Sequence, residues 1–181
     1  MEGSKHAVDA ALTAPGRVDP LPLVATATAA AGTDAEFSAF YRAEYERFVR
    51  VAFLIVGSTE VAEEVVQEAF VRLHGRWSRV ANPTSYLRTS VVNGCRDTIR
   101  RRVRWRLREP VLAAPATTSD EPDELFDALA RLTPRQRAVV VLRFYDGLQE
   151  AEIAEVVGMK VGTVKSTLHR SIEQLRKEIE R

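Results

Sequence analysis

The feature that most constrains the fold is the stretch 150–177, in which two apolar repeats flank a glycine. Ile153, Val156 and Val157 give one apolar face to a short segment before Gly158. After the glycine, apolar residues recur at steps of four, four and three, the spacing of one helix face. These residues are Val164, Leu168, Ile172 and Leu175. Gly158 stands where a turn between helices needs a residue that accepts a positive φ. The pattern predicts a helix-turn-helix.

The outward face of the second helix of this unit is polar, and none of the six residues assigned to it is acidic. Its members are Lys160, Thr163, Lys165, Ser166, His169 and Arg170. Cations and short hydrogen-bond donors, on a helix held by its opposite face, suit the major groove of DNA. Small residues and a glycine turn also occur in ordinary helical hairpins, so the spacing alone leaves a plain bundle as the alternative.

Composition narrows the class of protein. The chain has 181 residues, of which 45% are apolar and 28% charged, as in globular proteins. No apolar run approaches the ~20 residues that span a bilayer, and the N-terminus lacks the pattern of a secretion signal. Cys95 is the only cysteine, which excludes an internal disulfide and fits a reducing compartment. We therefore expect a cytoplasmic protein with no membrane partner, and in Cys95 a structural thiol rather than a redox sensor.

Motifs of catalysis are missing from the sequence. It has no Gly-rich phosphate loop, no His/Cys cluster with metal-ligand spacing and no plausible catalytic triad. His6, His74 and His169 lie far apart in unrelated contexts. We expect no catalytic residue, no metal, no cofactor and no small-molecule substrate.

Charge is strongly segregated, although the formal net charge is only +1. Eight acidic and three basic residues in 34–70 give −5, whereas eleven arginines and Asp97 in 71–108 give +10. Seven of these arginines lie between Arg96 and Arg108, too many for an ordinary solvated helix end. Such a block is the electrostatic footprint of polyanion binding.

Three segments with helical periodicity lie in 34–107 and predict a small all-α domain. Aromatic and aliphatic residues recur at helical spacing in 34–56, and Ser58 can cap the next helix. In about 59–74, Val61, Val65, Ala69 and Leu73 recur at steps of four, opposite an acidic face. The third helix begins at Asn82-Pro83, with Asn as N-cap and Pro at the first helical position. We expect the three helices to pack around one core.

The remaining segments complete an all-α chain of two small domains joined by a flexible linker. The Ala-, Thr- and Pro-rich segment 1–33 is predicted to be a disordered extension, and 108–120 a linker. The second domain, 121–181, contains TPRQ at 133–136, a helix start whose Gln can close a capping box. Val139, Val140, Leu142 and Phe144 are the expected core residues of that helix.

Together these segments resemble bacterial sigma factors of the extracytoplasmic-function group, group IV of the sigma-70 family. LTPRQRAVVVLRFYDGLQEAEIAEVVGMKVGTVKSTLHRSIEQLR is similar to their promoter-binding region 4. AEEVVQEAFVRLHGRW resembles the polymerase-binding helix of region 2.2, and NPTSYLRTSVVNGCRDTIRRR the element of regions 2.3 and 2.4 that recognises and melts the −10 sequence. The helix-turn-helix alone is moderately specific, since response-regulator effector domains look similar. The two domains together are highly specific.

The resemblance implies a sigma factor that binds core RNA polymerase, recognises −35 and −10 promoter elements and promotes DNA melting. The residues implied for docking on the β′ clamp helices are Glu63, Glu64, Gln67, Phe70, Arg72 and Trp77. Those implied for the −10 element are Asn82, Ser85, Tyr86, Asn93, Arg96, Asp97 and Arg100. The outward face of the recognition helix would read the −35 element, and the β flap is the polymerase element implied for this region.

Three residues depart from the family pattern. Lys160 and Gln149 replace common hydroxyl caps, and Thr167 replaces a frequent Arg. These three differences affect which −35 sequence the chain would prefer and how tightly it would bind that sequence. An anti-sigma factor, common in the family, is a candidate partner for the surfaces that face polymerase. The alternative is a stand-alone helix-turn-helix regulator, which leaves the domain 34–107 unexplained.

Overall fold

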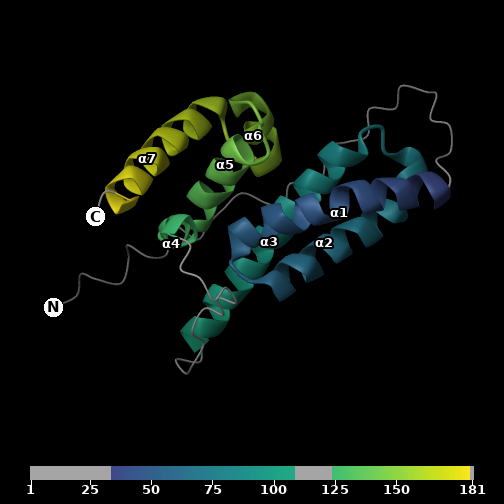
Figure 1. Cartoon of the computed structure of the whole chain (residues 1–181), viewed down its shortest axis with the longest axis horizontal. Helices are drawn as coiled ribbons and strands as arrows, with labels where there is room; N and C mark the ends of the chain where they lie inside the picture. Colours follow the sequence, from purple (N-terminus) through teal and green to yellow (C-terminus); the bar gives the residue numbers. More distant parts are fainter. Residues whose placement is uncertain (1–33, 109–123, 180–181) are drawn as a thin grey trace.

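The computed structural model describes residues 34–108 and 124–179 (Figure 1). Over these residues the chain is helical and contains no strand, which confirms the predicted fold class. The predicted extension 1–33 and nearly all of the predicted linker 108–120 lie outside the described residues, so neither prediction is tested.

The first unit consists of α1 (Asp34–Val56), α2 (Thr59–His74), a 3-10 turn η1 (Trp77–Arg79) and α3 (Pro83–Arg108). Gly57 ends α1 with a φ of +75°. Ser58 is the N-cap of α2, and its hydroxyl accepts a hydrogen bond from the backbone amide of Val61. The side-chain amide oxygen of Asn82 accepts a hydrogen bond from the backbone amide of Ser85 at 3.0 Å. The predicted helix starts at Ser58 and Asn82 are therefore confirmed.

The core of the first unit lies between its three long helices. Its largest fully buried side chains are Phe48, Val51, Ile55, Val66, Leu73, Leu87, Val91 and Val92. The helices α2 and α3 approach closely at Gly94, where a Cβ would lie 2.8 Å from Cγ1 of Val65. Cys95 is fully buried in this core, and burial raises the pKa of its thiol to about 12. The expectation of a buried thiol is confirmed.

The second unit consists of α4 (Glu124–Ala130), α5 (Pro134–Phe144), α6 (Glu150–Val157) and α7 (Val161–Ile179). The predicted capping box closes α5: the Thr133 amide donates to Gln136 at 3.0 Å, and the Gln136 amide donates back to the Thr133 hydroxyl. Gly158 ends α6 in the left-handed region, with φ +65°. The helices α6 and α7 thus form the predicted helix-turn-helix.

One core prediction for α5 is wrong. Val139, Val140 and Leu142 are buried as expected, but Phe144 is 64% exposed. Successive residues of an α-helix are turned by about 100°, so Phe144 points about 200° away from Leu142 and faces solvent. The apolar face of α5 ends two residues earlier than the sequence pattern suggests.

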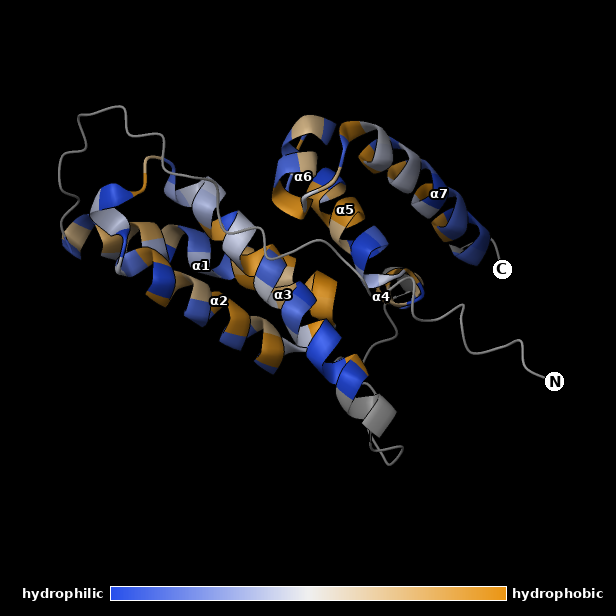
Figure 2. Ribbon diagram, turned by 180° about the vertical axis from the view of Figure 1, so that it is seen from behind, coloured by the Kyte–Doolittle hydropathy of each residue, from blue (hydrophilic) through white to orange (hydrophobic). Residues whose placement is uncertain are grey.

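The two units pack against each other. The helix α5 contacts α1, and α6 contacts α3, with the second unit lying along one side of the first (Figure 1). The buried apolar residues of both units form one continuous cluster. Much of α3 and the C-terminal part of α7 are hydrophilic in Figure 2. A linked pair of domains was the prediction, and this contact between them is an additional finding.

Candidate nucleic-acid interface

The helix α7 has the division of faces that the sequence predicts. Val164 and Leu168 are buried against the rest of the second unit. The six predicted polar residues are all exposed: Lys160, Thr163, Lys165, Ser166, His169 and Arg170. The opposite, polar face of α7 is therefore accessible to the major groove of DNA.

Local hydrogen bonds hold part of this polar face along the helix. Arg170 Nε donates to the Ser166 carbonyl at 3.1 Å, and the Ser166 hydroxyl donates to the Thr163 carbonyl at 3.1 Å. His169 lies 3.6 Å from Glu173. The Lys160 carbonyl accepts the first hydrogen bonds of α7, from the amides of Thr163 and Val164, but a lysine side chain offers no acceptor to cap the helix.

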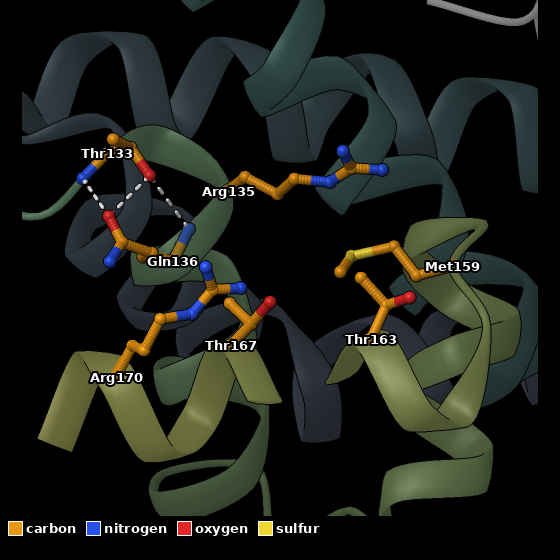
Figure 3. A pocket seen from close by; sticks show the side chains of 7 residues that line it. All are labelled: Thr133, Arg135, Gln136, Met159, Thr163, Thr167 and Arg170. Atoms are coloured by element: carbon orange, nitrogen blue, oxygen red, sulfur yellow. Dashed lines mark hydrogen bonds between the residues drawn. The ribbon is translucent and has the colours of Figure 1, made fainter. Parts of the chain in front are cut away.

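A groove of about 370 Å³ runs between α7 and the start of α5. Figure 3 shows Arg135 from α5 and Arg170 from α7 beside it, with Thr167 next to Arg170 and Thr163 next to Met159. Arg135 is exposed and was missed by the sequence reasoning, because it precedes the helix-turn-helix by fifteen positions. The capping motif at 133–136 was the available clue, since it places a helix N-terminus at this point.

The residues expected at the −10 element follow α3 from its N-terminus. Asn82, Ser85, Asp97 and Arg100 are exposed, and Tyr86, Asn93 and Arg96 are partly buried. Asn82 uses its amide oxygen for the helix cap, so its amide nitrogen is the group left to face a base.

Arg96 differs from its neighbours because it reaches the second unit. Its guanidinium donates to the carbonyl of Val157 in α6 at 3.2 Å. Burial lowers the pKa of Arg96, and the positive charges of Arg100 and Arg135 lower it further. Both units thus contribute arginines to one basic region, which favours a polyanionic ligand.

The exposed face of α2 is the candidate protein-binding surface. Glu63, Glu64, Gln67 and Arg72 are exposed on it. Gln67 donates to the Tyr45 hydroxyl at 3.4 Å. Sequence reasoning missed Val71, which is 72% exposed beside these residues. Its position four residues after Gln67 could have identified it.

Two residues predicted for this surface lie inside the first unit. Phe70 is 2% exposed and packs against Phe37, Phe40 and Tyr41 of α1. Phe70 lies inside the unit because the apolar stripe of α2 points toward α1, and its predicted role in binding polymerase stays a prediction. Trp77 is partly buried between Phe37 and Phe40, at ring distances of 5.3 Å, and its indole N–H has no acceptor among the residues that the structure describes. Both side chains support the surface rather than form it.

Metal and membrane features are missing from the part of the chain that the structure describes. No three His, Cys, Asp or Glu side chains there gather as metal ligands. None of the described helices is long and apolar enough to cross a membrane.

Comparison with known proteins places both units in one family. The model of "Sigma-70 region 2" matches residues 40–105, and that of "Sigma-70, region 4" matches residues 123–175. The RNA polymerase sigma-E factor of Streptomyces avermitilis is 35% identical over 159 residues, covering 80% of this chain and 86% of that protein. The ECF RNA polymerase sigma factor SigL of Mycobacterium tuberculosis is 31% identical over 162 residues, covering 80% and 92%.

A solved structure shares the fold. The sigma factor RpoE from Bartonella quintana, crystallised in complex with the anti-sigma factor NepR, superposes with a TM-score of 0.67 at 20% sequence identity. The match covers 80% of this chain and 97% of that one. Because region 2 and region 4 both match and relatives above 30% identity align over most of their length, this chain belongs to the extracytoplasmic-function group of the sigma-70 family of RNA polymerase sigma factors.

Proposed function

We propose that this sigma factor binds core RNA polymerase and directs it to promoters through two DNA-reading surfaces. Residues 34–107 form the region 2 domain, 108–120 the linker and 121–181 the region 4 domain. The observation that carries the proposal is α7: its apolar stripe is buried while all six polar residues of its other face are exposed. A stand-alone regulator would have no use for the region 2 unit.

We assign recognition of the −35 element to α7 and the groove beside it. Lys165, Ser166 and Arg170 face outward in the middle of the helix, where a recognition helix meets base edges. Arg135 stands across the groove and is a candidate phosphate contact, since arginine binds phosphate through a planar fork of donors. Thr167, which replaces a frequent arginine, is 7% exposed at the wall of the groove and offers no positive charge to a phosphate there.

The −10 element is assigned to α3. Asn82 and Ser85, at its exposed N-terminus, are the polar groups available to a base turned out of the stack. Arg96 and Arg100 stand one turn apart farther along the helix and would hold the phosphate backbone. Melting uses binding energy, since unstacking a base costs a few kcal/mol and stacking on protein returns about 1–3 kcal/mol per base.

Polymerase binding is assigned to the exposed face of α2. Three of its groups, Glu63, Glu64 and Gln67, would meet the β′ clamp helices, and Val71 supplies apolar area among them. An apolar centre with a polar rim is the usual anatomy of a protein–protein interface. Region 4 would contact the β flap.

The protein would act in the cytoplasm, where polymerase is found, and would have no catalytic centre of its own. An anti-sigma factor is a further candidate partner: the similar RpoE was crystallised with one. Such a partner would compete for the surfaces that bind polymerase.

Reconstituted transcription tests this proposal. The purified chain is added to sigma-free bacterial core polymerase with a genomic fragment library as template, and the RNA 5′ ends are sequenced. We expect discrete start sites that share spaced −35 and −10 elements. A Lys165→Ala, Arg170→Ala double variant should lose those starts, whereas the α7 variant Lys177→Ala should keep them. DNA binding without specific starts would contradict the proposal and favour the stand-alone regulator.

A further inference from the structure

A chain of side-chain hydrogen bonds ties α7 to the start of α5 and to the turn before it. The Gln136 side chain closes the capping box through its Oε1, which accepts from the Thr133 amide at 3.0 Å. Its Nε2 donates to Oε1 of Gln174 in α7 at 3.4 Å, and Nε2 of Gln174 donates to the Arg131 carbonyl at 3.2 Å. Gln174 therefore contacts both α5 and the turn between α4 and α5.

This bridge lies at one end of the groove between α5 and α7. Gln174 follows Arg170 by four positions, so both side chains are on one flank of α7. Figure 3 shows Gln136 and Arg170 together at that end of the groove, and Met159 and Thr163 at the other. Hydrogen bonds with fixed directions therefore bound one end of the groove, and a flexible thioether bounds the other.

We propose that Gln174 is a positioning residue for −35 recognition: acting through Gln136, it fixes the separation of Arg135 and Arg170 across the groove. The inference rests on the proposed function, because the two arginines need a set spacing only if they hold one stretch of DNA backbone. Both arginines line the groove, and Nε of Arg170 is held along the helix by the Ser166 carbonyl at 3.1 Å. In this role Gln174 itself touches no nucleotide.

Apolar packing alone does not fix this separation. Val164 and Leu168 are buried against the core, but hydrophobic contact is non-directional and allows a helix to shift. Hydrogen bonds restrict both distance and direction, and a preorganised pair of donors binds without the entropy cost of being ordered in the complex. The Arg131–Glu178 ion pair joins the same elements at 2.7 Å, but the Arg131 side chain is 60% exposed, and exposed pairs contribute little.

A purely structural role for Gln174 is the alternative. Carbonyls at the end of a helix such as α4 need donors, and side chains supply them here: Arg137 donates to the Ala130 carbonyl at 2.8 Å, as Gln174 does to that of Arg131. If this were its only role, loss of Gln174 would destabilise the unit and leave the contribution of Arg135 to DNA binding unchanged. The two roles therefore predict different coupling between Gln174 and Arg135.

The test is a double-mutant cycle in the full-length chain. Gln174→Met keeps an unbranched side chain of similar length and removes both hydrogen bonds. It is combined with Arg135→Ala across the groove and, separately, with Lys165→Ala on the outward face of α7. Arg131→Gln is the matched control, because it removes the exposed charge of the same turn and keeps the carbonyl that Gln174 uses.

Fluorescence anisotropy at several salt concentrations measures affinity for two duplexes. One carries the −35 element found in the transcription experiment, and the other carries a scrambled sequence of the same length. Circular dichroism and thermal unfolding establish that each variant is folded at the temperature of the titrations.

We expect Gln174→Met to weaken binding to the −35 duplex about three- to fivefold and to lower the slope of log K against log salt by about one, as Arg135→Ala does, because both lose the phosphate contact across the groove. In the Gln174→Met background, Arg135→Ala should weaken binding by less than about twofold more. Lys165→Ala should cost as much in that background as in wild type. Arg131→Gln should stay within about twofold of wild type.

Three results would overturn the inference alone. The first is an Arg135→Ala effect as large in the Gln174→Met background as in wild type, and the second is a folded Gln174→Met protein with wild-type affinity. The third is an equal attenuation of the Arg135→Ala and Lys165→Ala effects, since a general disruption of α7 predicts it. A wild-type protein that binds the −35 and scrambled duplexes equally would instead overturn the proposed function, and this inference with it.

Discussion

At the residue scale, the side chains of the candidate binding surfaces on α7 and α2 are exposed, whereas those that pack beneath them are buried. Lys165 and Arg170 project from α7 while Thr167, between them in sequence, is 7% exposed. On α2, Phe70 is 2% exposed and the adjacent Val71 is 72% exposed. Neighbours in sequence therefore have opposite roles, because adjacent residues of a helix point about 100° apart.

Lys165 provides the simplest test of the −35 surface. Lys165→Ala should weaken binding of the full chain to −35 DNA several-fold and lower the slope of log K against log salt by about one, as expected when one phosphate contact is lost. Anisotropy titrations at several salt concentrations measure both. Lys177→Ala, the same change near the end of α7, should alter neither. An equal loss in the two variants would mean that only overall charge matters.

Cys95 is expected to make the free energy of unfolding depend on pH. Its pKa is raised to about 12 by burial, whereas an unfolded thiol has a pKa of about 8.5. Above that unfolded pKa the unfolded state loses the proton first, so it binds fewer protons than the native state and stability falls as pH rises. We expect the midpoint of urea unfolding to decrease between about pH 8.5 and 12 more steeply in wild type than in Cys95→Ala. Parallel curves would exclude a contribution from this thiol.

At the element scale, helix starts and close approaches explain where each surface stands. The capping box of Thr133 and Gln136 starts α5 beside α7, which brings Arg135 to the groove. Gly94 allows α3 to lie against Val65 of α2, and this sets the position of α3 on the first unit.

Gly94→Ala tests that close approach. Overpacking costs typically 1–3 kcal/mol, while alanine gains about 1 kcal/mol of helix propensity over glycine. Because a new Cβ would lie 2.8 Å from the stiff Val65 side chain, we expect a net loss of stability in urea unfolding. Adding Val65→Ala should cost less than the sum of the single changes. Strict additivity would show that the two side chains do not compete for space.

The face of α2 can be tested as one element. Val71→Asp, or Glu64→Gln with Gln67→Ala, should weaken binding to core polymerase about five- to tenfold, the effect of removing a small number of interface contacts worth about 1 kcal/mol. Fluorescence titration with core enzyme measures the affinity. Glu46→Gln, on the exposed side of α1, is the charge-matched control. Affinity for −35 DNA should not change, and a parallel loss there would contradict the division of labour between the units.

At the scale of the whole molecule, the two units share one buried boundary. Asp146 joins α1 and α3 to region 4, and Phe126 stacks on Phe53. Units that share a buried interface unfold together when the interface is strong enough, and separately when it is weakened.

Phe126→Ala should therefore make the two units unfold in separate transitions. We expect wild type to show one calorimetric transition and the variant two, since the lost aromatic contact is worth about 0.5–1.5 kcal/mol beyond the area it buries. Phe144→Ala, which removes an aromatic ring that is 64% exposed, should keep the wild-type profile. Two transitions in wild type would show that the units are already independent.

Sequence alone determined the local features. Helix starts at Ser58, Asn82 and Thr133, the turn at Gly158 and the polar face of α7 all depend on residues within a few positions of one another, so spacing and cap chemistry were sufficient. The family assignment followed, because the motifs of regions 2 and 4 are contiguous stretches. The exposed end of the apolar stripe of α5 was harder to place, and Phe144 was misjudged for that reason.

Only the tertiary structure decided what lies between elements distant in the chain. Asp146 is 99 positions from Arg47 and 58 from Arg88, and no periodicity connects them. Arg135 lies at the groove beside α7 because α5 packs on α7, and Arg96 donates to the Val157 carbonyl because α6 packs on α3. Local propensities fix each helix, but which exposed charges meet is set by the packing of helices, and that depends on the whole core at once.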